Sequence, residues 1–310
     1  MSQISIVVEL CPANLLREAL ELVLRDLAPE HRHEIAAQSV GDGESNRSAG
    51  GPLMSARRGT ELCGAAWGQL QPGKTAIYWV PQLSTQAAGD ADIANRLTQA
   101  VTEALDAAGV DLTQTLLVDG SAPAARTLES AGFIYLAELL YLAGESTSVS
   151  SGPEHRENLE FVVYDDSQRG RLAALLERTY LNSRDCAAMN GKRQMDDVLD
   201  GYRTTGVYRP ENWMFVRSGK QDVGVLLLAD EPAAGHCELV YMGLVPEARG
   251  HGYGVQIAQH ALCLAERMSA ERVVLAVDAA NEPAVAMYSE AGFMVWDRRT
   301  VYVRYRGGKK

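Results

Sequence analysis

The sequence lacks the long apolar runs of a membrane protein. No stretch reaches the length of about 18 uncharged apolar residues that suggests a spanning helix, and residues 223–229 form one of the longer runs. A basic flank is also missing near the start, where the first cation is Arg17. We therefore expect neither a membrane-spanning helix nor a secretory signal.

Cysteine and positive charge are scarce as well. The 310 residues include five cysteines with no Cys-x-x-Cys spacing, which favours free thiols in a reducing cytoplasm. His31-x-His33 and His236-Cys237 have no third ligand at a suitable spacing, so we expect no metal site. The net charge of −11 argues against nucleic-acid binding. With 46% hydrophobic residues, the chain can build folded cores, and its length suits about two domains.

An internal repeat divides the chain into two related halves. Residues 124–133 read AARTLESAGF and residues 284–293 read AVAMYSEAGF. Val80-Pro81 and Val245-Pro246 lie at a slightly larger offset, which we interpret as a short loop change between the copies. The polar segment 144–158, GESTSVSSGPEHREN, is typical of a linker. We expect domains at residues 1–143 and 159–310, joined by a linker at 144–158.

Both halves show the same order of secondary structure. Hydrophobic patterning predicts a strand and one or two helices, then three strands, and finally a helix, a strand, a helix and a strand. The expected fold class is α+β, with two tandem domains, each a mixed, mostly antiparallel sheet flanked by helices.

A glycine-rich turn is the most specific local feature. An apolar strand over residues 239–245 runs into glycines at 250, 252 and 254, and a helix follows. Such a turn directs backbone N–H groups and the positive helix end at one point, which suits a phosphate or pyrophosphate. It has neither the Gly-Lys-Ser/Thr of a P-loop nor the GxGxxG spacing. A tight helix entry without a ligand is the alternative interpretation.

Two motifs in this half resemble the signatures of the GNAT (GCN5-related N-acetyltransferase) superfamily. The first is Arg249-x-x-Gly252-x-Gly254, and the second is Asn281-x-x-Ala284-x-x-x-Tyr288-x-x-x-Gly292-Phe293. The resemblance covers residues 159–310 and implies an acyltransferase that uses acetyl-CoA. It also assigns roles to the cofactor-binding residues, which are Leu244 and Val245 for the pantetheine arm, Arg249, Gly250, His251, Gly252, Tyr253 and Gly254 for the pyrophosphate, and Asn281 near the thiol.

The resemblance further implies that Tyr288 is the general acid that protonates the leaving CoA thiolate. A phenol has a pKa of about 10 and is protonated at neutral pH, so it can donate to a sulfur anion. A core aromatic on a short helix is the alternative interpretation of this residue.

Glu238 is the candidate general base. It begins an otherwise apolar strand, and two-residue alternation predicts that it shares a face with Val240, Met242 and Leu244. A carboxylate in this setting would be partly desolvated, with a raised pKa. The alternative is a strand-end carboxylate that faces solvent.

We expect the binding site for the acceptor amine, here called the acceptor side, between the first two helices of this half, over residues 180–193. Asp185 or Glu177 could bind a cationic amine, and Tyr202 or Tyr208 could line the site. Cys186 has no histidine at a supporting spacing, which argues against a nucleophilic role.

The first half lacks the glycine pattern. The corresponding turn carries Asp90 and Asp92, whose negative charge would repel a pyrophosphate, and Leu128 stands at the offset that matches Tyr288. We expect this domain to be non-catalytic and structural, with weak CoA binding as the alternative. A degenerate first half joined to an intact second half resembles the layout of the mycothiol synthases.

The predicted function is transfer of an acetyl group from acetyl-CoA to a primary amine of a small molecule. The alternatives are a protein acetyltransferase, acting on a lysine or an N-terminal amine, and a non-enzymatic acyl-CoA sensor. We expect no nucleic-acid or membrane partner.

Overall fold

The structure is a computed structural model that describes residues 5–27, 35, 50–118, 122–147, 159–184 and 194–308. The chain forms two compact units. The first unit comprises Met1–Leu136 and Thr300–Lys310, and the second comprises Ala137–Arg299. Within the described ranges, no helix is long and apolar enough to cross a membrane.

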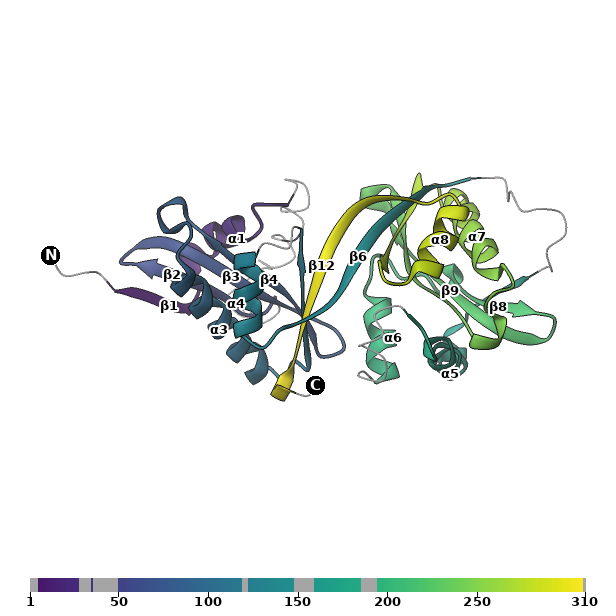
Figure 1. Cartoon of the computed structure of the whole chain (residues 1–310), viewed down its shortest axis with the longest axis horizontal. Coiled ribbons are helices and arrows are strands. Elements are labelled where there is room, and N and C mark those ends of the chain that lie inside the picture. The colour runs from purple at the N-terminus through teal and green to yellow at the C-terminus, as the bar shows by residue number, and fades with distance from the viewer. Residues whose placement is uncertain are drawn as a thin grey trace. The chain divides into compact units, whose positions relative to one another are not determined.

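The first unit contains a sheet with helices packed on both of its faces (Figure 1). Its strands run in the order β1-β2-β3-β4-β5, followed by the last residues of β12. Its elements are β1 (Ile6–Leu10), α1 (Leu16–Val23), β2 (Leu53–Arg58), β3 (Glu61–Gln71), β4 (Thr75–Leu83), α3 (Ala91–Ala107), β5 (Leu112–Leu117) and α4 (Ala122–Ser130).

The second unit repeats this plan, with the strand order β6-β11-β10-β9-β8-β7. Its elements are β6 (Ile134–Glu145), β7 (Glu160–Val163), α5 (Arg169–Tyr180), α6 (Met195–Arg203), β8 (Trp213–Ser218), β9 (Gln221–Glu231), β10 (His236–Leu244), α7 (Tyr253–Arg267), β11 (Arg272–Asp278), α8 (Glu282–Glu290) and β12 (Met294–Tyr305). In each unit one central pair is parallel, β4–β5 or β10–β11, and the other described pairs are antiparallel. The expected α+β class is confirmed.

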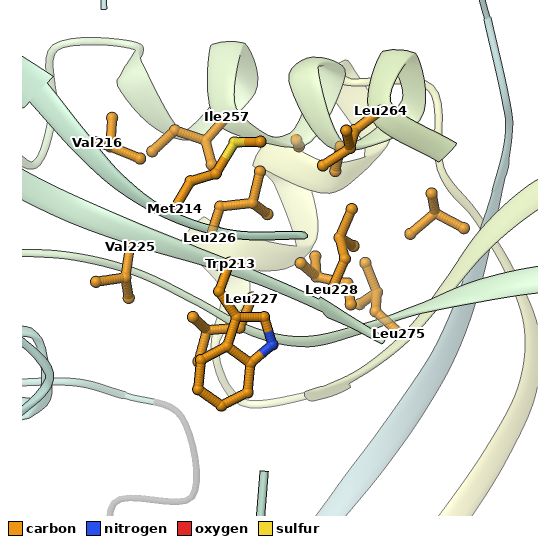
Figure 2. Close-up of a cluster of buried hydrophobic side chains, with 14 of the residues drawn as sticks. Trp213, Met214, Val216, Val225, Leu226, Leu227, Leu228, Ile257, Leu264 and Leu275 are labelled. Carbon is orange, nitrogen blue, oxygen red and sulfur yellow. The ribbon is translucent and has the colours of Figure 1, made fainter. Parts of the chain in front are cut away.

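Residues on neighbouring positions of the second unit's strands face opposite sides of its sheet (Figure 2). Met214 and Leu226 point toward α7, where they lie near Ile257, whereas Trp213 and Leu227 point to the other side. All five side chains belong to one buried core. This two-sided burial explains why β8 and β9 are almost continuously apolar rather than alternating.

The two units exchange their final strands. β6 follows α4 of the first half but pairs with β11 of the second unit, over Leu139–Glu145. In turn, the last part of β12, Thr300–Tyr305, pairs with β5 of the first unit. Arg304 anchors this end by donating to both carboxylate oxygens of Asp106, at 2.7 and 2.6 Å.

The exchange changes the expected division at residues 143 and 159. Gly144 and Glu145, which were assigned to the linker, belong to β6, while residues 300–310 belong to the first unit. The physical reason is that strand pairing, rather than position in the chain, decides which core a strand completes. Residues 148–158 of the expected linker lie outside the described residues.

The structure also corrects the register of the internal repeat. Val245 directly precedes a short 3-10 turn, and its N–H donates to the Val223 carbonyl at 2.9 Å. Ser84 also directly precedes a 3-10 turn, and its N–H donates to the Cys63 carbonyl at 2.9 Å. Val245 therefore corresponds to Ser84 and not to Val80. Val80 and Pro81 lie inside β4, so no loop change separates the copies there.

Candidate active site

The turn between β10 and α7 is open at the start of the helix. Gly252 is the N-cap of α7, with φ +75°, and no side chain caps the first turn. Gly250 has φ +80°, and both conformations favour glycine. Added Cβ atoms at these two positions would meet nothing within 4 Å, so backbone conformation rather than crowding requires glycine. The N–H groups of the first helical turn are left available to an anion.

The other residues of the turn support its shape. A Cβ on Gly254 would lie 3.0 Å from the Met287 side chain, so this glycine permits close packing of α7 on α8. Tyr253 is buried, and the exposed His251 stacks on its ring at 5.6 Å. A cavity of about 540 Å³ lies beside the turn and is lined by Arg178, Ser218, Gln221, Asp222, Val223, Val245, Glu247, Ala248, His251 and Tyr253.

Arg249 uses its side chain to hold the turn rather than to contact an anion. Its guanidinium donates to the carbonyl oxygens of Thr179 and Asn182, at 2.8 and 3.0 Å, and to that of Leu244 at 3.1 Å. Thr179 and Asn182 lie at the C-terminal end of α5, where a cation is favourable. The arginine of the first motif therefore joins α5 to the turn.

The two central strands of the second unit separate at Glu238. β10 and β11 pair only over His236–Glu238 and Arg272–Val274, and beyond this point β10 pairs with β9 alone. The described strands therefore leave one edge of β10 open. Val245 donates its N–H to Val223 of β9, and in an antiparallel pair the main-chain groups of successive residues point alternately toward and away from the partner strand. The main-chain groups of Leu244 and Met242 therefore point toward the opening.

This alternation contradicts the role that the resemblance implies for the main chain of Val245. Its N–H bonds to Val223 and its carbonyl accepts from Ala248 at 3.0 Å. The open edge therefore carries main-chain groups of Leu244 and Met242, and the role of Leu244 toward the pantetheine arm stays a prediction.

Glu238 lies at the apex of the opening, where burial and the nearby Glu231 raise the pKa of its carboxyl group. The expected set of neighbours on its face is wrong. A bulge at Val240 interrupts the pairing with β9 and moves later side chains to the other face. As a result Tyr241, rather than Met242 or Leu244, shares the face of Glu238.

Three tyrosines form a cluster on this face. Tyr241 stacks against Tyr202 of α6 at 5.7 Å and meets Tyr180 of α5 edge-on at 5.4 Å. The hydroxyls of Tyr180 and Tyr202 are 2.6 Å apart, and that of Tyr241 is 2.8 Å from the Thr179 hydroxyl. These contacts connect the helices of the expected acceptor side to the strand that carries Glu238.

Other acceptor-side candidates have different outcomes. Tyr208 lies in a separate group, where its hydroxyl donates to Asp166 at 2.9 Å, and burial and Asp166 raise its pKa to about 12. Glu177 is exposed on α5. Asp185 and Cys186 lie outside the described residues.

Sequence reasoning missed Tyr141 as a neighbour of Glu238. Tyr141 pairs with Ala276 on β11, which places it on the same face of the sheet. Burial raises the pKa of its phenol, Arg299 opposes this effect, and the Glu238 carboxylate adds to it. Only the pairing of β6 with β11 could have identified this neighbour, and the linear sequence does not contain that information.

Tyr288 and Asn281 lie on α8, on the α7 side of the sheet. Tyr288 is 7% exposed and packs edge-on against Phe293 at 5.6 Å. Asn281 is the N-cap of α8, yet its side chain makes no cap hydrogen bond. Because α8 packs on α7, Glu238 and Tyr288 belong to opposite faces of the sheet.

Among the described side chains, no group of three or more histidine, cysteine or acidic residues is placed so that it could hold a metal ion. His31 and His33 lie outside the described residues. The cysteines at 11, 63, 237 and 263 are buried free thiols.

Comparisons with known proteins show what this part of the chain is similar to. Residues 176–293 match the model of the acetyltransferase (GNAT) family. The chain is 36% identical over 77 residues to a mycothiol acetyltransferase of Arthrobacter sp. (strain FB24), and 38% identical over 71 residues to that of Paenarthrobacter aurescens (strain TC1). These alignments cover 25% and 23% of this chain and 23% and 21% of the relatives, so the matched part spans less than a quarter of the curated relatives' length.

Solved structures share the fold over nearly the whole chain. One is a GCN5-related N-acetyltransferase from Sphaerobacter thermophilus, with a TM-score of 0.67, 15% identity and coverage of 98% of this chain and 97% of that one. Another is a tandem GNAT protein from the clavulanic acid biosynthesis pathway, with a TM-score of 0.61, 15% identity and coverage of 99% and 100%.

Proposed function

We propose that the second unit transfers an acetyl group from acetyl-CoA to a primary amine of a small molecule. The proposal starts from the match of residues 176–293 to the model of the acetyltransferase (GNAT) family and from the fold that the chain shares with a solved tandem GNAT protein. The observation that carries the proposal is Glu238. Its carboxyl group has a raised pKa and lies where β10 and β11 separate, opposite the face that carries Tyr288.

The residues of the second unit suit the binding of acetyl-CoA. The uncapped first turn of α7 would accept the pyrophosphate, and the open edge of β10 at Met242 and Leu244 would pair with the amides of the pantetheine arm. Asn281, which has no cap bond of its own, would contact the arm near the thioester. The Leu244 carbonyl also accepts from Arg249 at 3.1 Å, so on this residue the N–H is the group offered to the arm.

The chemistry then divides between two side chains. Glu238, ionised, accepts a proton from the attacking amine, since only a neutral amine can add to the thioester carbonyl. Tyr288 donates its phenolic proton to the sulfur as the C–S bond breaks. The products are an acetamide and a CoA thiol, with one proton gained by Glu238 and one lost by Tyr288, and exchange with water restores both groups.

A small-molecule acceptor is favoured over a protein acceptor by two observations. The face that carries Glu238 is walled by Tyr180, Tyr202 and Tyr241, whose hydroxyls are already tied to one another or to Thr179. Such a wall suits a compact acceptor that fills a shaped site. The relatives that match in sequence are named mycothiol acetyltransferases, a name that refers to a small molecule.

The test is release of CoA thiol by the purified full-length chain, with acetyl-CoA and panels of small amines, lysine peptides and peptides with free N-termini. Turnover with a small amine supports the proposal, and turnover with a peptide alone would identify a protein acetyltransferase. Acetyl-CoA binding without any turnover would indicate a sensor.

Variants of the two catalytic candidates sharpen this test. Glu238→Gln should lower kcat by about 100-fold or more, as expected for loss of a general base, and Tyr288→Phe should lower kcat with acetyl-CoA affinity retained. Glu271→Gln, an exposed carboxylate of the same unit, is the control and should leave both values unchanged. An unchanged rate in either catalytic variant would remove that residue from its role.

A further inference from the structure

The sheet face that carries Glu238 continues over the neighbouring strands as a row of one small and two aromatic side chains. Ala276 lies on β11 and is exposed. Tyr141 lies on β6, pairs with Ala276 and is half-buried. Trp296 lies on β12, the strand next to β6, and meets Tyr141 edge-on with 6.0 Å between the ring centres. We call Ala276, Tyr141 and Trp296 the aromatic shelf.

Trp296 is unusually accessible for a tryptophan of this chain. It is 60% exposed, whereas Trp67 and Trp213 are each 1% exposed. Met294 and Val295, which directly precede it, are exposed as well. A contiguous exposed apolar patch is typical of a site that binds a ligand or partner, because covering a large ring removes apolar surface from water. The shelf therefore ends in a ring that gains free energy when another apolar group covers it.

The shelf begins beside the candidate base. Glu238 pairs with Val274 of β11, and Ala276 is the next residue of β11 on the same face. The Glu238 carboxylate is close enough to Tyr141 to raise the pKa of its phenol. Trp296 lies three strands from Glu238, which is roughly 14 Å across the sheet. An acceptor whose amine lies at Glu238 therefore reaches Trp296 only if it has an extended body.

The charged side chains next to the shelf are paired with one another. Arg299 and Asp297, which both act on the phenol of Tyr141, form an ion pair with 2.6 Å between nitrogen and oxygen. Arg298 forms an ion pair with Glu138. These two cations and two carboxylates add no net charge to the Trp296 end of the shelf. An uncharged group on the acceptor suits this end better than a second ionic group.

We propose that the acceptor amine carries an uncharged aromatic ring on a flexible carbon chain, and that this ring lies on the aromatic shelf against Trp296. The inference rests on the proposed acetyl transfer, because it names the class of acceptor for the same site. A ring on Trp296 buries apolar surface of both partners and adds a favourable ring–ring contact. The carbon chain lies over Ala276 and Tyr141, and the primary amine lies at Glu238. Trp296 is then a specificity-determining residue that takes no part in bond making.

The experiment compares 4-phenylbutylamine with butylamine in the CoA-thiol release assay on the full-length chain. The two amines share the reactive group and the carbon chain, so the ratio of their kcat/KM values isolates the contribution of the ring. We expect a preference of at least tenfold for the phenyl compound. Benzylamine should show a smaller preference over methylamine, because its ring is too close to the amine to reach Trp296.

Variants assign the preference to the shelf. Trp296→Ala should abolish most of the preference for 4-phenylbutylamine, and Trp296→Phe, which keeps a ring, should restore most of it. Val163→Ala is the matched control, because Val163 is an exposed apolar residue on β7, at the other end of the second unit's strand order. This variant should keep the preference of the unaltered chain. Both positions are exposed, and circular dichroism checks that the variants are folded.

Binding measured without turnover separates this inference from the proposed transfer. Calorimetric titration of 4-phenylbutylamine should show at least tenfold weaker binding to the Trp296→Ala chain than to the unaltered chain. If no amine is acetylated and this difference remains, the transfer is wrong and the shelf still binds a ring-bearing amine.

Three outcomes would overturn the inference whether or not acetyl transfer occurs. They are the absence of 4-phenylbutylamine binding, equal binding and equal preference in the Trp296→Ala and unaltered chains, and a preference for the diamine putrescine over 4-phenylbutylamine. The last outcome would show that the far end of the site takes a second cation in place of a ring.

Discussion

Replacing Gly252 by aspartate tests whether an anion binds at the start of α7. The substitution copies the N-cap of the first unit, Asp90, into the second. Gly252 has φ +75°, so any side chain there incurs a left-handed backbone cost of about 1–2 kcal/mol. No atom lies within 4 Å of the added Cβ, and steric clash therefore contributes nothing.

The main effect should be electrostatic. Two unit charges 4 Å apart interact by about 4 kcal/mol at an effective dielectric constant of 20. Gly252 is exposed, and we reduce this figure to about 3 kcal/mol for solvent screening, which corresponds to about 100-fold in affinity. Gly252→Asn is the matched control, because asparagine shares the backbone cost and can also cap the helix, but carries no charge.

The assay is calorimetric titration of acetyl-CoA into the wild-type, Gly252→Asp and Gly252→Asn chains at low and high salt. We expect the aspartate variant to bind about 100-fold more weakly than the asparagine variant at low salt, and the gap to narrow at high salt. Equal affinities for the two variants would refute the reasoning, because the charge at this N-cap would then face no anion.

Three further predictions concern pH and the division of the chain. Burial raises the pKa of Glu238, so kcat/KM should fall on acidification with a midpoint above the usual range of a glutamate, and a pH–rate profile with a midpoint inside that range would contradict this. Burial lowers the pKa of His260 to about 4, so between pH 6.5 and 4 the unfolded chain binds a proton that the folded chain does not. Denaturant unfolding should show roughly 3 kcal/mol of stability lost over this range, a loss that His260→Gln should abolish. Because the units exchange strands, fragment 137–299 should show a cooperative thermal transition by circular dichroism, whereas 159–310, which lacks β6, should not, and equal cooperativity in both fragments would be evidence against the exchange.

Features that depend on neighbouring residues were predictable from the sequence. The glycine turn, the start of α7 after Gly252 and the short helix that carries Tyr288 each depend on residues within a few positions of one another. Backbone preferences and helix-entry chemistry are local, and the order of strands and helices in both halves follows from the same kind of signal.

Features that depend on pairing between distant strands were not predictable. The alternation expected for β10 fails at Val240, because one extra residue in a strand reverses the face of every side chain after it. The same bulge places Tyr241 beside Glu238, and the pairing of β6 with β11 adds Tyr141. The neighbours of the candidate base are therefore set by contacts that hydrophobic patterning does not encode.

The internal repeat supplies a comparison that neither half could provide alone. Both units keep the strand separation, the 3-10 turn after it and a buried phenylalanine after the last short helix, at Phe133 and Phe293. With this frame retained, the units differ at the helix entry, where one has Asp90 as N-cap and the other has Gly252. The chemistry of each opening is therefore decided by a few side chains placed on a common backbone, which is why exchanging the N-cap residues is the most direct test of what each unit binds.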